Sequence, residues 1–431
     1  MIETYFVLPE RAQMLFDVNY TSALIQQNET QAYAVFNEYR LHTAVQPIFS
    51  LAHKRIVGYE ALVRIKDAGG QFVSPMVLFE SDQAQSEIVL LDRLCRHLHL
   101  HNFQLLADEL NWLFLNVSPH TIANGAAYGS FFLELLNLYH FPPERVVIEV
   151  VEYPVDNRDL LLKTVDFYKD LGCLIAIDDF GAGHSNFDRI WGLTPNIVKI
   201  DRAMIQNASE KNQIRNLLSG MISLLHQIGA LVVIEGIETV EQAMIALESD
   251  ADFVQGFLFA TPTMALSPDL SFAYSFETLF KAYKEKATQR ENITQNFFYR
   301  YTALFKKAAL GIKGRLNWNE ACTELLKDDN VVRCYLLSPS GIQIDHTKTN
   351  LRFMNKSDPR FKPLEAANSA DWFRRHYLKR AVMHPEQMQI TRPYLSITGA
   401  HMCITLSMMV SGSEGDRVLC CDLNFDDHMD L

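Results

Sequence analysis

The sequence predicts an α/β protein built on a (β/α)8 barrel, followed by a helical connector and a smaller α+β domain. Eight short runs rich in β-branched and other apolar residues recur between about residues 45 and 260. Longer amphipathic segments separate these runs, and acidic residues gather where the runs end. A chain of 431 residues, 48% of them hydrophobic, is long enough to form two or more packed domains.

The eight runs are VQPIF, VGYEALVRI, LFLNVS, VVIEVVE, CLIAIDDF, NIVKID, LVVIEG and DFVQGFLF. Most of them are nearly continuous in apolar residues, as strands are when helices cover both faces of a sheet. The intervening segment RDLLLKTVDFYKDLG has helical periodicity and ends at Gly172, a typical helix C-terminus. Eight such βα units predict a closed barrel.

The segments flanking the barrel have different patterns. LIQQNETQAYAVFNEYRL predicts a helix before the first barrel strand, and the charged segment from Phe272 to about Ala309 predicts a connecting helix. The expected divisions are an N-terminal helical extension (1–40), the barrel (41–265), the helical connector (266–309) and a C-terminal domain (310–431).

The last 120 or so residues predict a sheet crossed by a helix. RCYLLSPSGIQIDHT predicts a hairpin around Ser-Pro-Ser-Gly, and DWFRRHYLKRAVMHP predicts a helix. YLSIT, HMCITLSMMV and RVLCCDLNF predict three further strands.

Composition narrows the class of protein. The net charge is −12 and no basic stripe is present, so DNA is not an expected partner. The seven cysteines have no C-x-x-C spacing, which favours a reducing compartment. Without a signal-peptide pattern or a run of 18 apolar residues, we expect a cytoplasmic protein with no membrane span.

Five acids fall late in the apolar runs or just after them: Glu149, Asp178, Asp179, Asp201 and Glu235. The strands of a barrel end at one mouth, where active sites of this fold lie. Five acids there would repel one another without cations. Two divalent ions about 3.5 to 4 Å apart can clamp the attacking and leaving oxygens of a phosphodiester displacement, and such ions prefer oxygen ligands.

Lys199 and Asp201 alternate with apolar neighbours in VKID, so both side chains can point into the same mouth. A lysine among carboxylates can orient an attacking water and balance negative charge that develops in the transition state. The alternative is that Lys199 and Asp201 simply pair with each other.

Eight motifs along the barrel occur in a familiar order: QPI (46–48), EALVR (60–64), LNVSP (115–119), EVVE (149–152), DDFGAGHSN (178–186), VKIDR (198–202), EGIE (235–238) and QGFLF (255–259). With them the chain resembles the EAL-domain family, whose active members are metal-dependent cyclic di-GMP phosphodiesterases. The resemblance covers roughly residues 41 to 265 and implies the EAL variety of the TIM-like barrel.

The resemblance assigns roles to individual residues. It implies two Mg²⁺ or Mn²⁺ ions per active site, bridged by Asp178. The implied metal ligands are Glu60, Asn116, Glu149, Asp178, Asp179 and Glu235. The implied catalytic residues are Lys199, Glu235 and Asp201, and the implied substrate contacts are Gln46, Leu62, Arg64, Asp201, Glu238 and Gln255. Glu152 and Ser185 are implied to hold the loop that follows Asp179.

The function implied is hydrolysis of cyclic di-GMP to linear pGpG in bacterial second-messenger signalling, by a homodimer. The alternative is a catalytically weak or inactive EAL receptor that binds cyclic di-GMP and signals to a protein partner. The chain departs from the family pattern at Ile65, Val151, His184 and 260–262, and none of these positions is an implied metal ligand.

The C-terminal domain is loosely similar to PAS-like or Cache-like sensory domains in the order of its elements. Such a domain would regulate the barrel and bind a small molecule between its sheet and a long loop at about 345–395, with Arg374, Arg375, Arg392 and Tyr394 as candidate contacts. The alternative is a module for dimerisation, packing or a protein partner.

Overall fold

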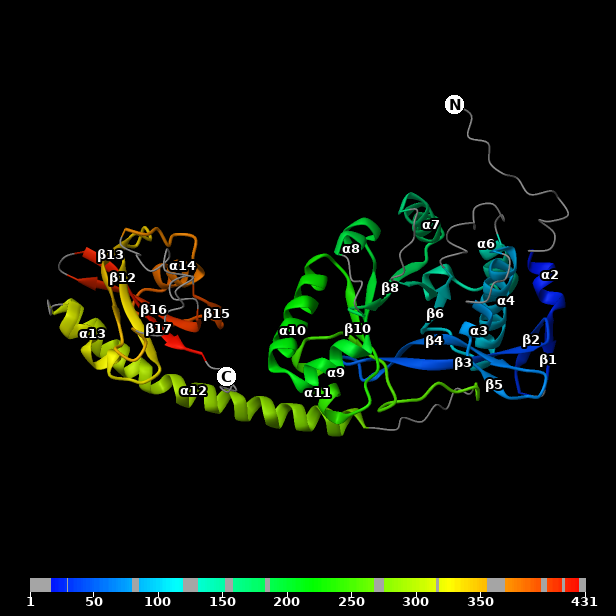
Figure 1. Cartoon of the computed structure of the whole chain (residues 1–431), viewed down its shortest axis with the longest axis horizontal. Helices are drawn as coiled ribbons and strands as arrows, with labels where there is room; N and C mark the ends of the chain where they lie inside the picture. Colours follow the sequence, from blue (N-terminus) through cyan, green and yellow to red (C-terminus); the bar gives the residue numbers. More distant parts are fainter. Residues whose placement is uncertain are drawn as a thin grey trace, which may run out of the picture. The chain divides into compact units, whose positions relative to one another are not determined.

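The computed structural model describes residues 17–28, 30–79, 85–118, 131–151, 158–182, 187–266, 275–314, 318–354, 369–396, 401–412 and 415–425. The chain forms two compact units, Met1–Tyr283 and Lys284–Leu431, and the division falls within helix α12 (Phe276–Lys313) (Figure 1). Each unit is described by itself below. The domain limits expected from the sequence stay predictions.

The first unit contains a closed barrel of eight strands, and each of the eight predicted runs overlaps one of them. The strands are β3 (Tyr39–Ser50), β4 (Arg55–Lys66), β6 (Trp112–Val117), β7 (Val146–Val151), β8 (Leu174–Phe180), β9 (Ile197–Ile200), β10 (Leu231–Ile234) and β11 (Phe253–Val254). They pair in the order β3-β11-β10-β9-β8-β7-β6-β4, and β4 pairs with β3 to close the ring. The short strand β5 (Phe72–Val73) extends the sheet beside β4.

The prediction of eight βα units was wrong at the first strand. Strand β3 runs antiparallel to both of its neighbours, β4 and β11, whereas the other barrel strands pair in parallel. Only the turn at 51–54 joins β3 to β4. A parallel crossover needs a dozen or more residues, so a connection this short forces a hairpin.

Helices follow most of the parallel strands and cover the barrel. They are α3 (Met76–Phe79) and α4 (Gln85–Phe103) after β4, α6 (Phe131–Tyr139) after β6, α7 (Arg158–Asp170) after β7, α8 (Phe187–Leu193) after β8, α9 (Arg202–Glu210) and α10 (Asn212–Gln227) after β9, and α11 (Val240–Glu248) after β10. Local sequence sets their ends. Thr239 and Gln242 form a capping box at the start of α11, and Gly172, at φ 97°, follows the end of α7.

The N-terminal helical extension was a wrong prediction for residues 25–36. Helix α2 spans only Val18–Ala23, and it is followed by strands β1 (Ile25–Gln27) and β2 (Ala32–Phe36), which continue the sheet beside β3. The run AYAVF alternates between buried and half-buried side chains, the period of a strand. Asn102 of α4 fixes β2, because its amide bonds the backbone N–H and C=O of Ala32 at 2.8 and 2.9 Å.

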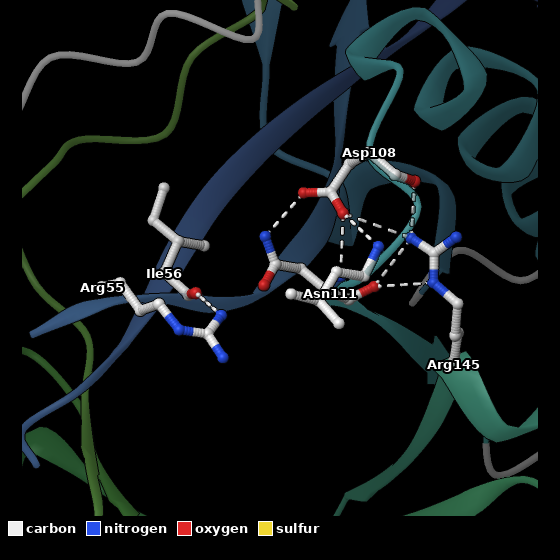
Figure 2. Close-up of polar contacts among 6 residues, drawn as sticks. Arg55, Ile56, Asp108, Asn111 and Arg145 are labelled. Carbon is white, nitrogen blue, oxygen red and sulfur yellow. Dashed lines mark hydrogen bonds and ion pairs between the residues drawn. The ribbon is translucent and has the colours of Figure 1, made fainter. Parts of the chain in front are cut away.

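The end of the barrel opposite the mouth is held by a polar turn that precedes β6 (Figure 2). Asp108 accepts hydrogen bonds from the backbone N–H of Asn111 at 2.7 Å and from the Asn111 amide at 2.6 Å. Arg145, at the end of the 3-10 helix η3 (Pro143–Arg145), donates to the carbonyls of Asp108 at 2.6 Å and Asn111 at 2.9 Å. The starts of β6 and β7 are thereby tied together at the end of the barrel that serves stability.

The second unit contains an antiparallel sheet in the order β13-β12-β17-β16-β14, with β15 paired to β16. Its strands are β12 (Val331–Leu337), β13 (Gln343–Thr349), β14 (Gln389–Ile390), β15 (Tyr394–Leu395), β16 (Met402–Gly412) and β17 (Gly415–Asn424), and its helices besides α12 are α13 (Trp318–Leu326) and α14 (His376–Met383). The predicted hairpin around Ser-Pro-Ser-Gly and the predicted strands HMCITLSMMV and RVLCCDLNF are confirmed, whereas YLSIT is a strand only at Tyr394–Leu395 within the described residues.

Two cores flank this sheet. One combines α12 and α13 with side chains such as Leu336, Leu406 and Leu419, and the other combines α14 with side chains such as Leu337 and Val418. The helix α14 is shorter than predicted, because Asp371 and Trp372 form a turn with the backbone N–H groups of Phe373 and Arg375. Among the described residues, no helix combines the length and apolar character needed to cross a membrane.

Candidate active site

Two layers of side chains fill the barrel, and the polar layer is the candidate site. The lower layer is apolar: Ile48, Phe114, Val147, Ala176, Ile197, Val233 and Phe253, from seven of the strands. On β4 the corresponding position is Gly58, where a Cβ would lie 2.6 Å from the ring of Phe114. Because strand side chains alternate in direction, the next inward position on each strand belongs to the mouth. Those eight positions are Gln46, Glu60, Asn116, Glu149, Asp178, Lys199, Glu235 and Gln255.

Lys199 lies at the centre of this polar layer and is only 1% exposed. Its Nζ lies 2.6 Å from Glu149 Oε1 and 2.7 Å from Glu235 Oε1. It also lies 3.2 Å from Asp178 Oδ1 and 3.4 Å from Glu60 Oε2. A buried lysine is tolerated when carboxylates pair with it, so one cation here organises four acids from four different strands.

Amide side chains connect the same acids. The Asn116 amide donates to Glu149 Oε2 at 2.8 Å and to Glu60 Oε1 at 3.3 Å. The Gln255 amide donates to Glu60 Oε2 at 2.7 Å and to Gln46 Oε1 at 3.2 Å. The network leaves the carboxylates in defined orientations without adding positive charge.

The acids form two groups with one member in common. Ligand atoms of Glu60, Glu149 and Asp178 lie within 4.8 Å of one another, and so do those of Asp178, Asp179 and Glu235. Asp179 has φ 55°, in the left-handed region that non-glycine residues seldom adopt. Aspartate tolerates this region better than most residues, and such strain collects at functional sites. The two groups hold five carboxylates around one lysine, so the mouth has an excess of negative charge.

Burial and the excess charge together shift the pKa values of the group. Burial raises the pKa of Glu149 well above its usual value, and Lys199 only partly opposes this effect. The pKa of Glu235 is raised to about 8 by burial and by Asp178 and Glu60, against the pull of Lys199. Burial and the neighbouring acids raise the pKa of Asp179 to about 6. Burial alone would lower the pKa of Lys199, but the four carboxylates outweigh it and raise this pKa well above the usual value.

The alternative that Lys199 simply pairs with Asp201 is wrong, since the lysine contacts the four other acids. Asp201 caps helix α9 by accepting a hydrogen bond from the backbone N–H of Ala203 at 2.9 Å. Its remaining acceptor capacity is free for a further contact.

The other predicted substrate contacts lie around this layer. Leu62 and Arg64 continue the inward face of β4 after Glu60, and both are half-buried. Burial lowers the pKa of Arg64, against the pull of Glu60. Glu238 is exposed at the start of α11. Glu152 and Ser185 lie outside the described residues, so their role in the loop stays a prediction.

A second cavity, of about 950 Å³, lies in the C-terminal unit. All four contacts predicted there line it: Arg374, Arg375, Arg392 and Tyr394. Arg380 and Gln389 also line it and were missed. A helical spacing of four residues from His376 would have identified Arg380, whereas Gln389 reaches the cavity only through the folding of the chain.

The arrangement of the first unit agrees with comparisons to known proteins. Residues 28–262 match the EAL domain family. The cyclic di-GMP phosphodiesterase RocR of Pseudomonas aeruginosa is 30% identical over 162 residues, which cover 36% of this chain and 40% of RocR. The uncharacterized EAL-domain containing protein YkuI of Bacillus subtilis is 29% identical over 223 residues, which cover 51% of this chain and 54% of YkuI. The chain thus spans about half the length of these curated relatives, or less.

The crystal structure of YkuI in complex with substrate c-di-GMP and calcium superimposes with a TM-score of 0.73 at 21% identity. The superposition covers 90% of this chain and 96% of that chain, and at this identity it shows the fold alone. The match to the family spans more than half of the sequence and includes every side chain of the polar layer. The chain therefore belongs to the EAL-domain family.

Proposed function

We propose that the barrel hydrolyses cyclic di-GMP to linear pGpG. The observation that carries this proposal is the polar layer of the mouth, in which two groups of acids share Asp178 and surround one buried lysine. RocR is named as a cyclic di-GMP phosphodiesterase, and YkuI binds c-di-GMP with calcium. This chain has the same fold as YkuI and belongs to the same family, which supports the same ligand here.

The residues of the mouth fit two divalent metal ions, and we include Mg²⁺ or Mn²⁺ in the proposal. All donors are carboxylate or amide oxygens, the ligands that hard cations prefer. Five carboxylates exceed the charge of Lys199, so cations would relieve their repulsion. Glu60, Asn116 and Glu149 would hold one ion, Asp179 and Glu235 the other, and Asp178 both. When bound, the ions would lower the pKa of water and stabilise charge on the phosphate oxygens.

The side chains of the chain itself would then position the reactants. Water attacks phosphorus, the bond between phosphorus and the 3′ oxygen breaks, and the leaving oxygen takes up a proton. Lys199 would orient the water and offset the developing negative charge. Glu235, whose carboxylate lies 2.7 Å from Lys199 Nζ in the same polar layer, would accept the proton of the water. Asp201, at the start of α9, would assist Lys199 and Glu235 in positioning the reactants.

Substrate contacts would come from residues around the polar layer. The guanidinium of Arg64 can grip a phosphate with two parallel hydrogen bonds. Leu62 offers an apolar surface to a base, and Glu238, Gln46 and Gln255 offer polar contacts to guanine or ribose. These contacts would bind the dinucleotide, whereas the acids and Lys199 would act on the scissile bond.

The experiment that tests this function is a hydrolysis assay on the full chain with Mn²⁺ or Mg²⁺ and cyclic di-GMP. We expect pGpG to form, Glu60→Ala to abolish its formation, and Asp108→Asn, at the opposite end of the barrel, to retain it. Tight binding with intact nucleotide recovered under every metal condition would replace hydrolysis with the receptor alternative. The absence of both binding and turnover would refute the hydrolysis proposal and the receptor alternative.

The remaining parts of the proposal concern context. We propose that the second unit is a PAS-like or Cache-like sensory domain, supported by an antiparallel sheet crossed by α14 and by the cavity lined by the predicted residues. We also propose a cytoplasmic protein, since its seven cysteines are free and buried, as suits a reducing compartment.

A homodimer belongs to the same proposal. Trp191 of α8, the helix that begins soon after Asp179, is 64% exposed, and aromatic side chains are enriched at protein–protein interfaces. Trp191→Glu should convert a dimer to a monomer in analytical ultracentrifugation, and a wild-type monomer at all concentrations would contradict the dimer.

A further inference from the structure

The cavity of the second unit collects positive charge. Four arginines line it: Arg374, Arg375, Arg380 and Arg392. Within the described part of the chain, the rest of its lining includes no aspartate or glutamate. This concentration of guanidinium groups stands out in a chain with a net charge of −12.

No described residue balances the charge of these arginines. Among the described residues, no carboxylate forms an ion pair with any of the four, although acids pair with arginines elsewhere in the unit, as in Arg333 with Asp422 at 2.6 Å. Arg375 is the most informative of the four. Its Nε is buried and has no hydrogen-bond partner within the described part of the chain. A buried donor without an acceptor costs about 1 to 3 kcal/mol, so this position favours a ligand that supplies an acceptor.

Aromatic rings hold Arg375 in place. Its guanidinium carbon lies 5.8 Å from the centre of the Trp372 ring and 5.7 Å from that of Tyr394. Such contacts stabilise the cation and restrict its rotamers without using its N–H donors. Arg375 also occupies the N-cap position of α14 and makes no side-chain capping bond, so it offers no acceptor to the first-turn N–H groups. Donors that are both fixed and unused are suited to an anion.

We propose that this cavity binds a small organic anion with two or more carboxylate or phosphate groups. Arginine is suited to both groups, because its planar fork matches a pair of anionic oxygens. A volume of about 950 Å³ is much larger than a single inorganic ion needs and lies at the upper end of ordinary small-molecule sites. Four arginines call for more than one negative charge on the ligand.

The cavity is linked to the interior of the sheet. The hydroxyl of Tyr394 lies 2.6 Å from that of Thr405, which donates to Asp422 Oδ1 at 2.6 Å. Asp422 is fully buried and accepts a hydrogen bond from Arg333 Nε at 2.6 Å. An anion that contacts Tyr394 therefore touches one end of a buried polar chain that crosses β15, β16, β17 and β12. This gives a bound ligand a physical route to the sheet.

The inference deepens the proposed sensory role by naming the ligand class, and its test does not depend on hydrolysis. The full chain is titrated calorimetrically with citrate and with GDP, in EDTA so that the barrel holds no metal. Acetate and guanosine serve as matched probes with one charge and no charge. We expect citrate or GDP to bind and the matched probes to bind at least about tenfold more weakly. The preferred probe distinguishes a carboxylate ligand from a phosphate ligand.

Variants assign the binding to the cavity. Arg375→Ala and Arg380→Ala should each weaken binding of the preferred probe about tenfold or more, because each removes charged hydrogen bonds. Lys379→Ala removes the same charge from α14 outside the cavity lining and should change binding less than about twofold. The thermal transition of each variant without ligand shows whether it folds, and Arg375→Lys, which keeps the charge, should bind with intermediate affinity.

Three results would overturn the inference. Neither citrate nor GDP binds, or the arginine variants that fold bind as tightly as the wild type, or Lys379→Ala weakens binding as much as they do. None of these results would change the outcome of the hydrolysis assay with Mn²⁺ or Mg²⁺, so the two proposals fail separately.

Discussion

The mouth of the barrel and the cavity of the second unit both gather charges of one sign, but they manage them differently. In the barrel, Glu60, Glu149 and Asp178 are buried, Asp179 and Glu235 are half-buried, and Lys199 supplies an internal counter-charge. In the second unit, Arg374, Arg380 and Arg392 are exposed, water screens them, and no carboxylate of the described residues pairs with them. Like charges that are buried therefore need a counter-charge within the fold, whereas exposed charges are screened by water until a ligand binds.

The largest expected effect comes from removing the internal counter-charge. Lys199→Met would leave four carboxylates buried around an apolar side chain. We expect the free energy of unfolding in EDTA to fall by about 3 to 5 kcal/mol, because breaking a buried ion pair strands the remaining charges. Urea unfolding measures this change, with Lys379→Ala as the exposed control. A Lys199→Met protein as stable as the wild type would show that the acids do not need the lysine.

Bound metal ions should balance the negative charge of the mouth that Lys199 leaves unbalanced. At about a hundred times its Kd, each bound Mn²⁺ should stabilise the wild type by about 2.7 kcal/mol, because it binds the folded state alone. Glu60→Gln should lose most of this stabilisation, while Arg375→Ala should keep it. Thermal or urea unfolding with and without EDTA measures the difference, and equal stabilisation of Glu60→Gln and the wild type would remove Glu60 from the metal ligands.

A smaller effect, on stability but not on kcat, is expected at the end of the barrel opposite the mouth. Asp108→Ala removes the acceptor for two hydrogen bonds from Asn111 and should lower the free energy of unfolding by about 1 to 3 kcal/mol. Since Asp108 lies before β6, away from the mouth, kcat should stay within about twofold of the wild type. Urea unfolding and the hydrolysis assay together check this pair of outcomes. A large loss of kcat in a folded Asp108→Ala protein would mean that the two ends are coupled.

The smallest expected effect is the change of ligand affinity with pH. This change should differ between the barrel mouth and the cavity of the second unit. The pKa of about 8 for Glu235 and about 6 for Asp179 means that protons compete with metal at neutral pH. The affinity for Mn²⁺ should therefore rise as the pH increases from about 6 to about 9. Without metal, stability should fall over this range, because the unfolded chain ionises these acids more readily. Citrate binding by arginines should stay constant between about pH 7 and 9, since guanidinium does not titrate there. Calorimetry at several pH values checks both trends, and an Mn²⁺ affinity independent of pH would contradict the raised pKa values.

The sequence predicted the polar layer well for a physical reason. Strand alternation places every second side chain in the barrel, so acids near the ends of apolar runs had to meet at the mouth. It could not show which acids Lys199 would contact, because those contacts depend on the tilt and register of four strands. The lysine contacts Glu149 and Glu235, while Asp201, two residues away on the same run, caps α9.

The errors came from segments whose structure depends on distant contacts. LIQQNETQAYAVF has no strong strand signal of its own, and β2 is stabilised by pairing with β3 and by bonds from Asn102. The direction of β3 was readable from the sequence, because only residues 50–56 separate VQPIF from VGYEALVRI, too few for a parallel crossover. In the second unit, Arg374, Arg375 and Arg392 were predicted but Arg380 of α14 was missed, and Gln389 joins them only after β14 pairs with β16.

The central claim is that an excess of buried acids makes the barrel mouth a site for two divalent ions. The most direct test is the number of Mn²⁺ ions bound per chain, measured by calorimetry on the full protein with a non-hydrolysable cyclic di-GMP analogue present. The account predicts two ions for the wild type and at most one for Asp179→Asn, which keeps the shape of the side chain and removes its charge. Failure of the wild type to bind Mn²⁺ at millimolar concentration, or equal binding by Asp179→Asn, would contradict it.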